Sequence, residues 1–160
     1  MTPLDDAVTL GEARDWLRDR VDHGEHCPCC TQFAKVYRRA LTSAPARVLI
    51  ELHRRDQGGA YLFLPTILDT MTGTPHQGGY GTLGHHWGLL EPQPGEREDG
   101  SWRVGWWRLT DRGRAFVLGR RTVPKYARIY DGRCLGLDGP DWTIVQALGK
   151  RFDYRELMDG

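Results

Sequence analysis

The chain has 160 residues, 39% of them hydrophobic and 27% charged, and its formal net charge is +1. This composition is typical of a globular protein with its own core, and no apolar run approaches the length of a membrane span. Acidic residues close to the N-terminus argue against a secretion signal, so we expect a cytoplasmic protein with no membrane partner. The near-neutral charge excludes a general attraction to nucleic acid, and DNA binding would therefore depend on local patches.

Two helices are expected near the N-terminus. Thr9 and Glu12 have the spacing of a capping box, and hydrophobic residues recur at helical intervals over residues 10–22. Thr31 is the expected cap of a second helix that runs to about residue 42. The apolar stripe of this second helix consists of Phe33, Val36, Tyr37, Ala40 and Leu41.

A cluster of cysteine and histidine separates these two helices. In a cytosolic protein such a cluster indicates metal binding or redox chemistry more often than a disulfide. Cys27 and Cys30 have C-x-x-C spacing, and Pro28 suits the tight turn that lets two thiolates hold one zinc ion. We expect a structural Zn²⁺ on Cys27, Cys30, His26 and His23 that joins the first helix to the second. Further ligands available elsewhere in the sequence are Cys29, His53, His85, His86 and Cys134.

Two other interpretations of the cluster stay open. Small buried cysteines often do no more than pack a junction between helices. Alternatively, Cys27-Pro28-Cys29-Cys30 resembles the C-P-Y-C motif of glutaredoxins, and Thr122-Val123-Pro124 resembles their T-V-P segment. That resemblance implies a thiol redox protein, in which a thiolate at a helix N-terminus is acidified.

The middle of the chain reads as helix, strand, helix and turn. Ser43 followed by Pro45 starts a third helix, which the glycines at 58 and 59 end. Residues 61–64 are expected to form a short strand, and residues 65–70 a short helix. The glycine-rich segment 72–81 is the expected turn before a weak helix that carries Leu83 and Trp87 and stops at Gly88.

A hairpin and a helix follow, and a second hairpin and two short helices are expected in the C-terminal part. Leu89 begins a strand, residues 92–100 form a polar turn, and residues 102–110 return as a second strand. Thr110 and Asp111 start the next helix. Beyond it we expect a hairpin over 123–137 that turns at Asp131-Gly132, a helix capped by Asp141, and a last helix over 152–158.

This order, with two short motifs, resembles winged helix-turn-helix domains of MarR-like and PadR-like regulators. Gly88-Leu89-Leu90-Glu91 is similar to their "GLIE" strand, and residues 107–113 (W-R-L-T-D-R-G) are similar to their "Y-x-L-T-x-x-G" segment. The resemblance implies an α+β fold. A single domain would comprise N-terminal helices with the Cys/His cluster (1–42), a winged-helix core (43–118), and a C-terminal hairpin and helix (119–160).

The resemblance also implies a function in transcription regulation, as a DNA-binding protein and possible homodimer. In such domains one helix lies in the major groove of double-stranded DNA and the wing reaches an adjacent groove. Bases would be read by Thr82, His85 and His86. Phosphates would be held by the wing residues Arg97 and Arg103 and by the helix residues Arg112 and Arg114.

The alternative function is a winged-helix module that binds a host or transcription-complex protein. Trp102, Val104 and Trp106 alternate along one strand and would form an aromatic patch, which more often marks a protein contact than a base-stacking site. The expected wing tip is mostly acidic and would repel phosphates. No catalytic motif is present, so an enzyme is not expected.

Overall fold

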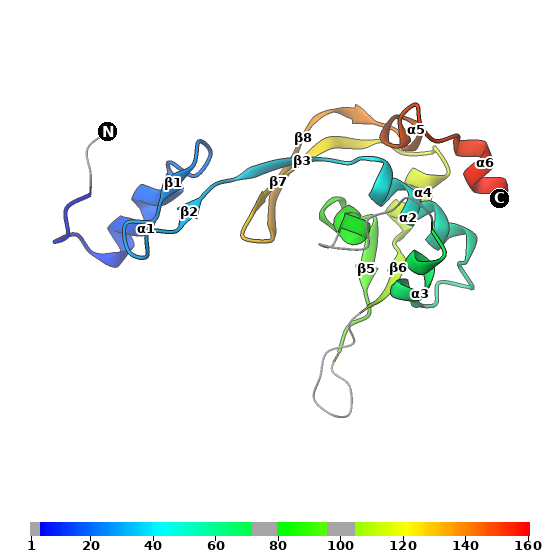
Figure 1. Ribbon diagram of the computed structural model, residues 1–160, viewed down its shortest axis with the longest axis horizontal. Coiled ribbons are helices and arrows are strands. Elements are labelled where there is room, and N and C mark those ends of the chain that lie inside the picture. The colour runs from blue at the N-terminus through cyan, green and yellow to red at the C-terminus, as the bar shows by residue number, and fades with distance from the viewer. Residues whose placement is uncertain (1–3, 72–79, 96–104) are drawn as a thin grey trace.

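The computed structural model describes residues 4–71, 80–95 and 105–160, which form a mixed α+β fold of short helices and small antiparallel sheets (Figure 1). Among these residues, none of the helices is both long enough and apolar enough to cross a membrane. The elements follow in this order: α1 (Leu10–Arg18), β1 (Glu25–His26), β2 (Phe33–Ala34), β3 (Tyr37–Ala40), α2 (Ser43–Arg54), β4 (Leu62–Phe63), α3 (Leu64–Asp69), the 3₁₀ helix η1 (Tyr80–Trp87), β5 (Leu90–Pro92), β6 (Trp106–Leu109), α4 (Asp111–Val117), β7 (Val123–Tyr130), β8 (Arg133–Trp142), α5 (Ile144–Leu148) and α6 (Tyr154–Asp159).

The first helix begins as the sequence predicts and ends earlier. The Thr9 N–H donates to Oε2 of Glu12 at 2.7 Å, and the Glu12 N–H donates to Oγ1 of Thr9 at 3.2 Å, which completes the capping box. The helix ends at Arg18, and the chain then turns into the β1–β2 hairpin.

The second predicted helix is wrong, because its residues are extended. Thr31 has a φ of 64° and lies in a turn, so it does not cap a helix. The residues that follow form β2 and β3. The β3 strand pairs antiparallel with β7, with Tyr37 opposite Ile129 and Ala40 opposite Tyr126. Pairing with a distant strand overrides the helical spacing of the apolar residues, so α1 is the only helix before α2 in the described residues.

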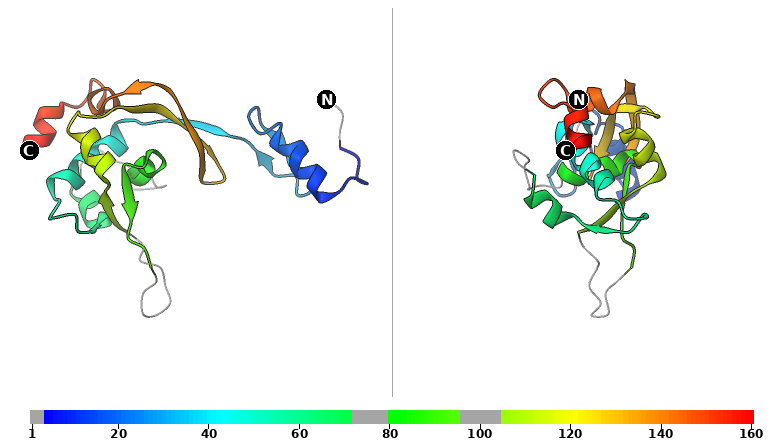
Figure 2. Two further views of the ribbon diagram at one scale, coloured as in Figure 1. Left: turned by 180° about the vertical axis from the view of Figure 1, so that it is seen from behind. Right: turned by 90° about the vertical axis from the view of Figure 1, so that its right-hand side faces the viewer.

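The strands β3, β7 and β8 form one sheet, which connects the two ends of the molecule. Figures 1 and 2 show the N-terminal module, α1 with the β1–β2 hairpin, at one end and the main body at the other. The β7–β8 hairpin turns at Asp131-Gly132 as predicted, with φ angles of 50° and 72° that fit a type I′ turn. Asp22 pairs with Arg128 of β7 at 2.5 Å, which anchors the N-terminal module to the sheet, and the Val36 N–H, just before β3, donates to the Val21 carbonyl at 2.8 Å.

The hydrophobic core of the main body is built around α2. Its buried residues include Val48, Leu49 and Leu52, which belong to one cluster with residues of η1, α4 and α5. The predicted helices after Ser43 and over 65–70 are confirmed as α2 and α3, and the predicted strand over 61–64 is confirmed as β4. Asp141 does not cap the helix that follows, because it pairs with Pro124 inside β8; Thr143 caps α5 instead.

A second sheet of three strands has the order β4-β6-β5 and lies beside η1 and α3 (Figure 1). Leu90 of β5 lies opposite Leu109 of β6, and Leu62 of β4 lies opposite Trp107. The predicted turn over 72–81 and the first part of the predicted strand over 102–110 fall largely outside the described residues. Gly88 ends η1 with a φ of 73°, as expected for the residue after a helix.

The two motifs of the sequence, residues 88–91 and 107–113, dock onto each other. Oγ1 of Thr110 donates to the Gly88 carbonyl at 2.5 Å, and the Thr110 N–H donates to the Leu89 carbonyl at 3.2 Å. Gly113 lies directly against Leu89. A Cβ added at Gly113 would sit 2.7 Å from the Leu89 carbonyl carbon, closer than real Cβ contacts come. A glycine is therefore required at position 113.

The substitution Gly113→Ala should lower the free energy of unfolding by about 3 kcal/mol, because the new methyl group meets main-chain atoms that no rotamer change can move. Chemical denaturation measures the loss. Gly11→Ala is the control, since a Cβ at Gly11 meets only Oγ1 of Thr9 at 3.8 Å. Equal stability of the Gly113→Ala protein and the wild type would contradict this docking.

Candidate functional site

The helix η1 is held by residues on its inner side. Trp87 is buried, and its Nε1–H donates to the Pro124 carbonyl of β7 at 2.6 Å. Gly84 is also buried, and a Cβ there would lie 3.1 Å from Cδ2 of Leu90, so this glycine allows η1 to approach the core closely. The inner side of η1 is therefore fixed against both sheets and the core.

The helix η1 carries the three residues predicted to read bases, Thr82, His85 and His86, of which Thr82 and His86 are half-buried. His85 is exposed, and its Nδ1 lies 2.6 Å from the Thr82 carbonyl oxygen. The rings of His85 and His86 are in contact, with centroids 3.9 Å apart and planes tilted by 37°. His86 is half-buried, and this burial lowers its pKa, with a smaller contribution from His85. At neutral pH the half-buried His86 is therefore an uncharged hydrogen-bonding group.

Two of the arginines predicted to contact phosphate, Arg112 and Arg114, lie among the described residues. Each of them binds another group of this protein. Arg112 donates from Nε to the Trp87 carbonyl at 2.9 Å, at the C-terminal end of η1. Arg114 pairs with Asp56 at 3.2 Å and with Asp111 at 3.0 Å. The predicted wing residues Arg97 and Arg103 lie outside the described residues. The structure thus gives Arg112 and Arg114 a structural role.

Arg121 is a further cation whose charge acts on Arg112, and it is not among the residues predicted to bind DNA. Burial lowers the pKa of Arg112, and the positive charge of Arg121 lowers it further. Arg121 is exposed and has no ion pair within the part of the chain that the structure describes. The Arg-Arg pair at 120–121, directly after the helix that follows the second motif, is the sequence signal that marks it.

An aromatic pair lies at the edge of the sheet formed by β4, β6 and β5. The Phe63 and Trp106 rings have centroids 5.3 Å apart, and Phe63 is 39% exposed. Trp102 and Val104, predicted to extend this patch, lie outside the described residues. Gly105 has a φ of 90°, and a Cβ there would lie 2.9 Å from the Phe63 ring. The glycine therefore leaves room for the aromatic pair.

The cysteines occupy the turn of the β1–β2 hairpin. The Cys27 N–H donates to the Gln32 carbonyl at 2.8 Å, and the Thr31 N–H donates to the Cys27 carbonyl at 2.9 Å. These bonds close a tight turn in which the backbone amides of Cys30 and then Cys29 hydrogen-bond to the Cys27 sulfur and lower the pKa of its thiol. Backbone amides directed at a sulfur favour the thiolate, which is the form that binds metal.

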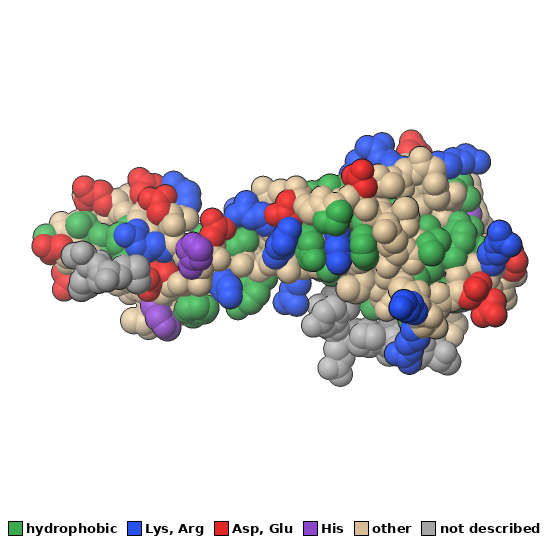
Figure 3. All heavy atoms as spheres, turned by 90° about the horizontal axis from the view of Figure 1, so that it is seen from above, with side chains coloured by type: hydrophobic (Ala, Val, Ile, Leu, Met, Phe, Trp, Pro, Cys, Tyr) green, Lys and Arg blue, Asp and Glu red, His purple; other side chains and the backbone are tan. Residues whose placement is uncertain are grey.

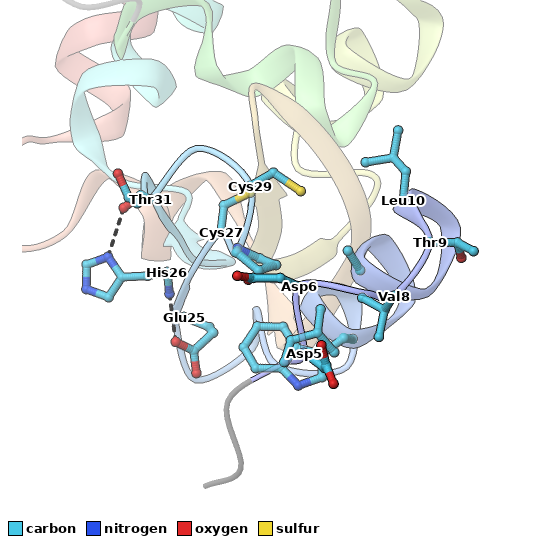
Figure 4. Close-up of a pocket in the computed structure, with 14 residues that line it drawn as sticks. Asp5, Asp6, Val8, Thr9, Leu10, Glu25, His26, Cys27, Cys29 and Thr31 are labelled. Carbon is cyan, nitrogen blue, oxygen red and sulfur yellow. Dashed lines mark hydrogen bonds between the residues drawn. The ribbon is translucent and has the colours of Figure 1, made fainter.

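The predicted histidine ligands do not join these cysteines. Nδ1 of His26 lies 3.1 Å from the Thr31 carbonyl oxygen, and its ring packs on Phe33 with centroids 5.2 Å apart. Figure 4 shows the His26 ring directed away from Cys27 and Cys29. His23 is exposed. In the described ranges, no three side chains of the His, Cys, Asp or Glu type gather as metal ligands.

The hairpin faces α1 across an open cleft of about 650 Å³ (Figure 4). Ala13 and Trp16 of α1 line one side of this cleft, and Cys27, Pro28 and Cys29 line the other. Asp5 and Asp6 lie at its edge and make the surroundings acidic. The cleft therefore suits a cation better than an anion.

Comparisons of this chain with models of protein families, with curated proteins and with solved structures find no match.

Replacing Arg112 tests whether it serves the fold. Arg112→Ala should lower the free energy of unfolding by about 1–2 kcal/mol, because the Trp87 carbonyl loses a charged donor. Thermal denaturation checks this. Arg120→Ala is the matched control, since Arg120 is exposed and has no ion pair among the described residues. If both variants keep wild-type stability, Arg112 does not hold the end of η1.

Proposed function

We propose that residues 43–118 form a winged helix-turn-helix domain that binds double-stranded DNA and acts as a transcriptional regulator. The order of elements supports the proposal: α2, β4, α3, η1, β5, β6 and α4 follow one another as in that fold, with a three-stranded antiparallel sheet of order β4-β6-β5. The observation that carries it is the placement of η1, buried along Trp87 and open to solvent at His85.

In this proposal η1 enters the major groove. It is a 3₁₀ helix of eight residues, in which His85 is exposed and Thr82 and His86 are half-buried. A histidine ring forms single hydrogen bonds and lacks the bidentate fork with which Arg or Asn reads a base edge. Base selectivity would accordingly be modest, and affinity would depend mainly on phosphate contacts.

The local charge beside η1 supports a phosphate contact at Arg121. Arg112 places positive charge at the C-terminal end of η1 and the charge of the exposed Arg121 acts on it, whereas Asp56 and Asp111 neutralise Arg114. Because the chain as a whole is close to neutral, binding would depend on local patches such as this one and the wing.

The second candidate function is binding to a protein partner through the patch at Phe63 and Trp106. A partly exposed phenylalanine in contact with a tryptophan ring is an anchor of the kind found at the centre of protein interfaces. Under this alternative, Phe63→Ser abolishes capture of the partner and leaves DNA affinity unchanged.

DNA binding is tested by fluorescence anisotropy with labelled duplexes over a range of salt concentrations. We expect the affinity to fall steeply with salt, and Arg121→Gln should weaken it about three- to tenfold and reduce the salt slope by about one. His85→Ala should reduce the preference between duplex sequences more than the overall affinity.

Lys150→Gln is the control, because Lys150 is an exposed cation in the turn after α5. No binding at low salt, or equal losses for Arg121→Gln and Lys150→Gln, would refute the DNA-binding proposal and favour the protein-binding one.

A further inference from the structure

Two cations flank an exposed tyrosine on the edge strand β3. Nζ of Lys35 lies 5.9 Å from the centroid of the Tyr37 ring, and Cζ of Arg39 lies 5.6 Å from it. All three residues, which we call the cationic strip, are exposed. Neither cation has an ion pair within the described ranges, and the chain has no Asp or Glu between Glu25 and Glu51. An anion placed at Tyr37 would therefore contact both cations.

The register of β3 against β7 places the cationic strip on the side of the sheet that packs on η1. Tyr37 lies opposite Ile129, and Arg39 lies opposite Ala127. Residues directly opposite each other in an antiparallel pair project from the same face. Ala127 is fully buried and belongs to the core cluster that includes Trp87 of η1. Figures 1 and 2 show η1, β5 and β6 below this sheet, so the cationic strip and η1 share its lower side.

The upper face of the same sheet has paired charges instead. Nε of Arg38 donates to Oδ1 of Asp138 at 2.9 Å, and Cζ of Arg38 lies 3.9 Å from the centroid of the Tyr126 ring. Arg128, which lies opposite Arg38, pairs with Asp22. Figure 3 shows this face from above, with acidic side chains among the basic ones. The unpaired positive charge of the strand therefore lies on the side of η1.

We propose that the cationic strip binds the phosphate backbone of double-stranded DNA beside the stretch that η1 contacts. This inference rests on the DNA-binding function proposed above and adds a second contact to it. Lys35 and Arg39 each neutralise a phosphate, and the phenolic O–H of Tyr37 donates to a phosphate oxygen between them. Because these groups contact phosphates and not base edges, the strip adds affinity without sequence preference.

The charges on either side of the cationic strip define how far this contact extends. A duplex held at η1, a helix of eight residues, continues past the helix and brings further phosphates to the lower side of the sheet. Beyond Lys35 the chain enters the N-terminal module, in which acidic residues outnumber basic ones over residues 4–25. That module repels phosphates, so the contact with DNA ends at Lys35.

The experiment compares two labelled duplexes, one of about 10 base pairs and one of about 20, which are roughly one and two helical turns long. Fluorescence anisotropy measures the affinity of the full chain for each duplex over a range of salt concentrations. The double variant Lys35→Gln/Arg39→Gln should bind the longer duplex about tenfold more weakly, with a salt slope reduced by about two. Its affinity for the shorter duplex should change less than about twofold, because that duplex is held at η1 and the wing.

Arg38→Gln is the matched control. It removes one positive charge from the same strand, next to Arg39, but from the upper face of the sheet, where Arg38 pairs with Asp138. Its affinity for both duplexes should stay within about twofold of the wild type. Circular dichroism and thermal denaturation of the same samples should show wild-type folding of the double variant, because Lys35 and Arg39 are exposed.

The outcomes separate this inference from the DNA-binding proposal. If the wild type binds neither duplex at low salt, both are wrong. If it binds both duplexes and Arg121→Gln weakens the binding, but the double variant matches Arg38→Gln, only the cationic strip is refuted. Equal losses on the two duplexes would show a general attraction and no separate contact. If the double variant loses binding to labelled polyglutamate and keeps its affinity for DNA, the strip binds an acidic protein instead.

Discussion

The contact between the end of η1 and the start of α4 is the constraint on which the rest of the main body depends. Gly113 lies against the Leu89 backbone, Thr110 binds the Gly88 and Leu89 carbonyls, and Arg112 binds the Trp87 carbonyl. Because these partners are main-chain atoms, the contact determines the path of the backbone. It sets where η1 stops and where the strand pair β5 and β6 begins, and so determines which side of η1 faces solvent.

The charges around the solvent-facing side of η1 determine which groups this side can bind. Arg114 is neutralised by Asp56 and Asp111, and Arg112 is directed into the protein, so neither arginine is simply a free cation. Arg121 is exposed and its charge acts on Arg112, and His85 is an exposed polar group on η1. A protein of nearly neutral charge that binds DNA through so small a patch would bind weakly as a monomer. A dimer would compensate, because two linked sites raise the effective concentration of each.

The opposite end of the molecule has different chemistry. The N-terminal module is acidic, carries three of the cysteines, and is attached through β3 to the sheet with β7 and β8. Its β1–β2 hairpin is too small for a core of its own, and small units of this kind are usually stabilised by a metal or by association.

The sequence by itself determined the features that depend on near neighbours. These include the capping box of Thr9 and Glu12, the turn at Asp131-Gly132, and the series from α2 to α4 with its two motifs. The tertiary structure alone decided that residues 33–40 are strands, because the partner of β3 is the β7 strand, far along the chain. It also decided that Arg114 is paired and that His26 is directed away from the cysteines. Residue type and spacing show which groups can ionise or bind metal, but pairing partners and side-chain direction depend on contacts that no local stretch of sequence contains.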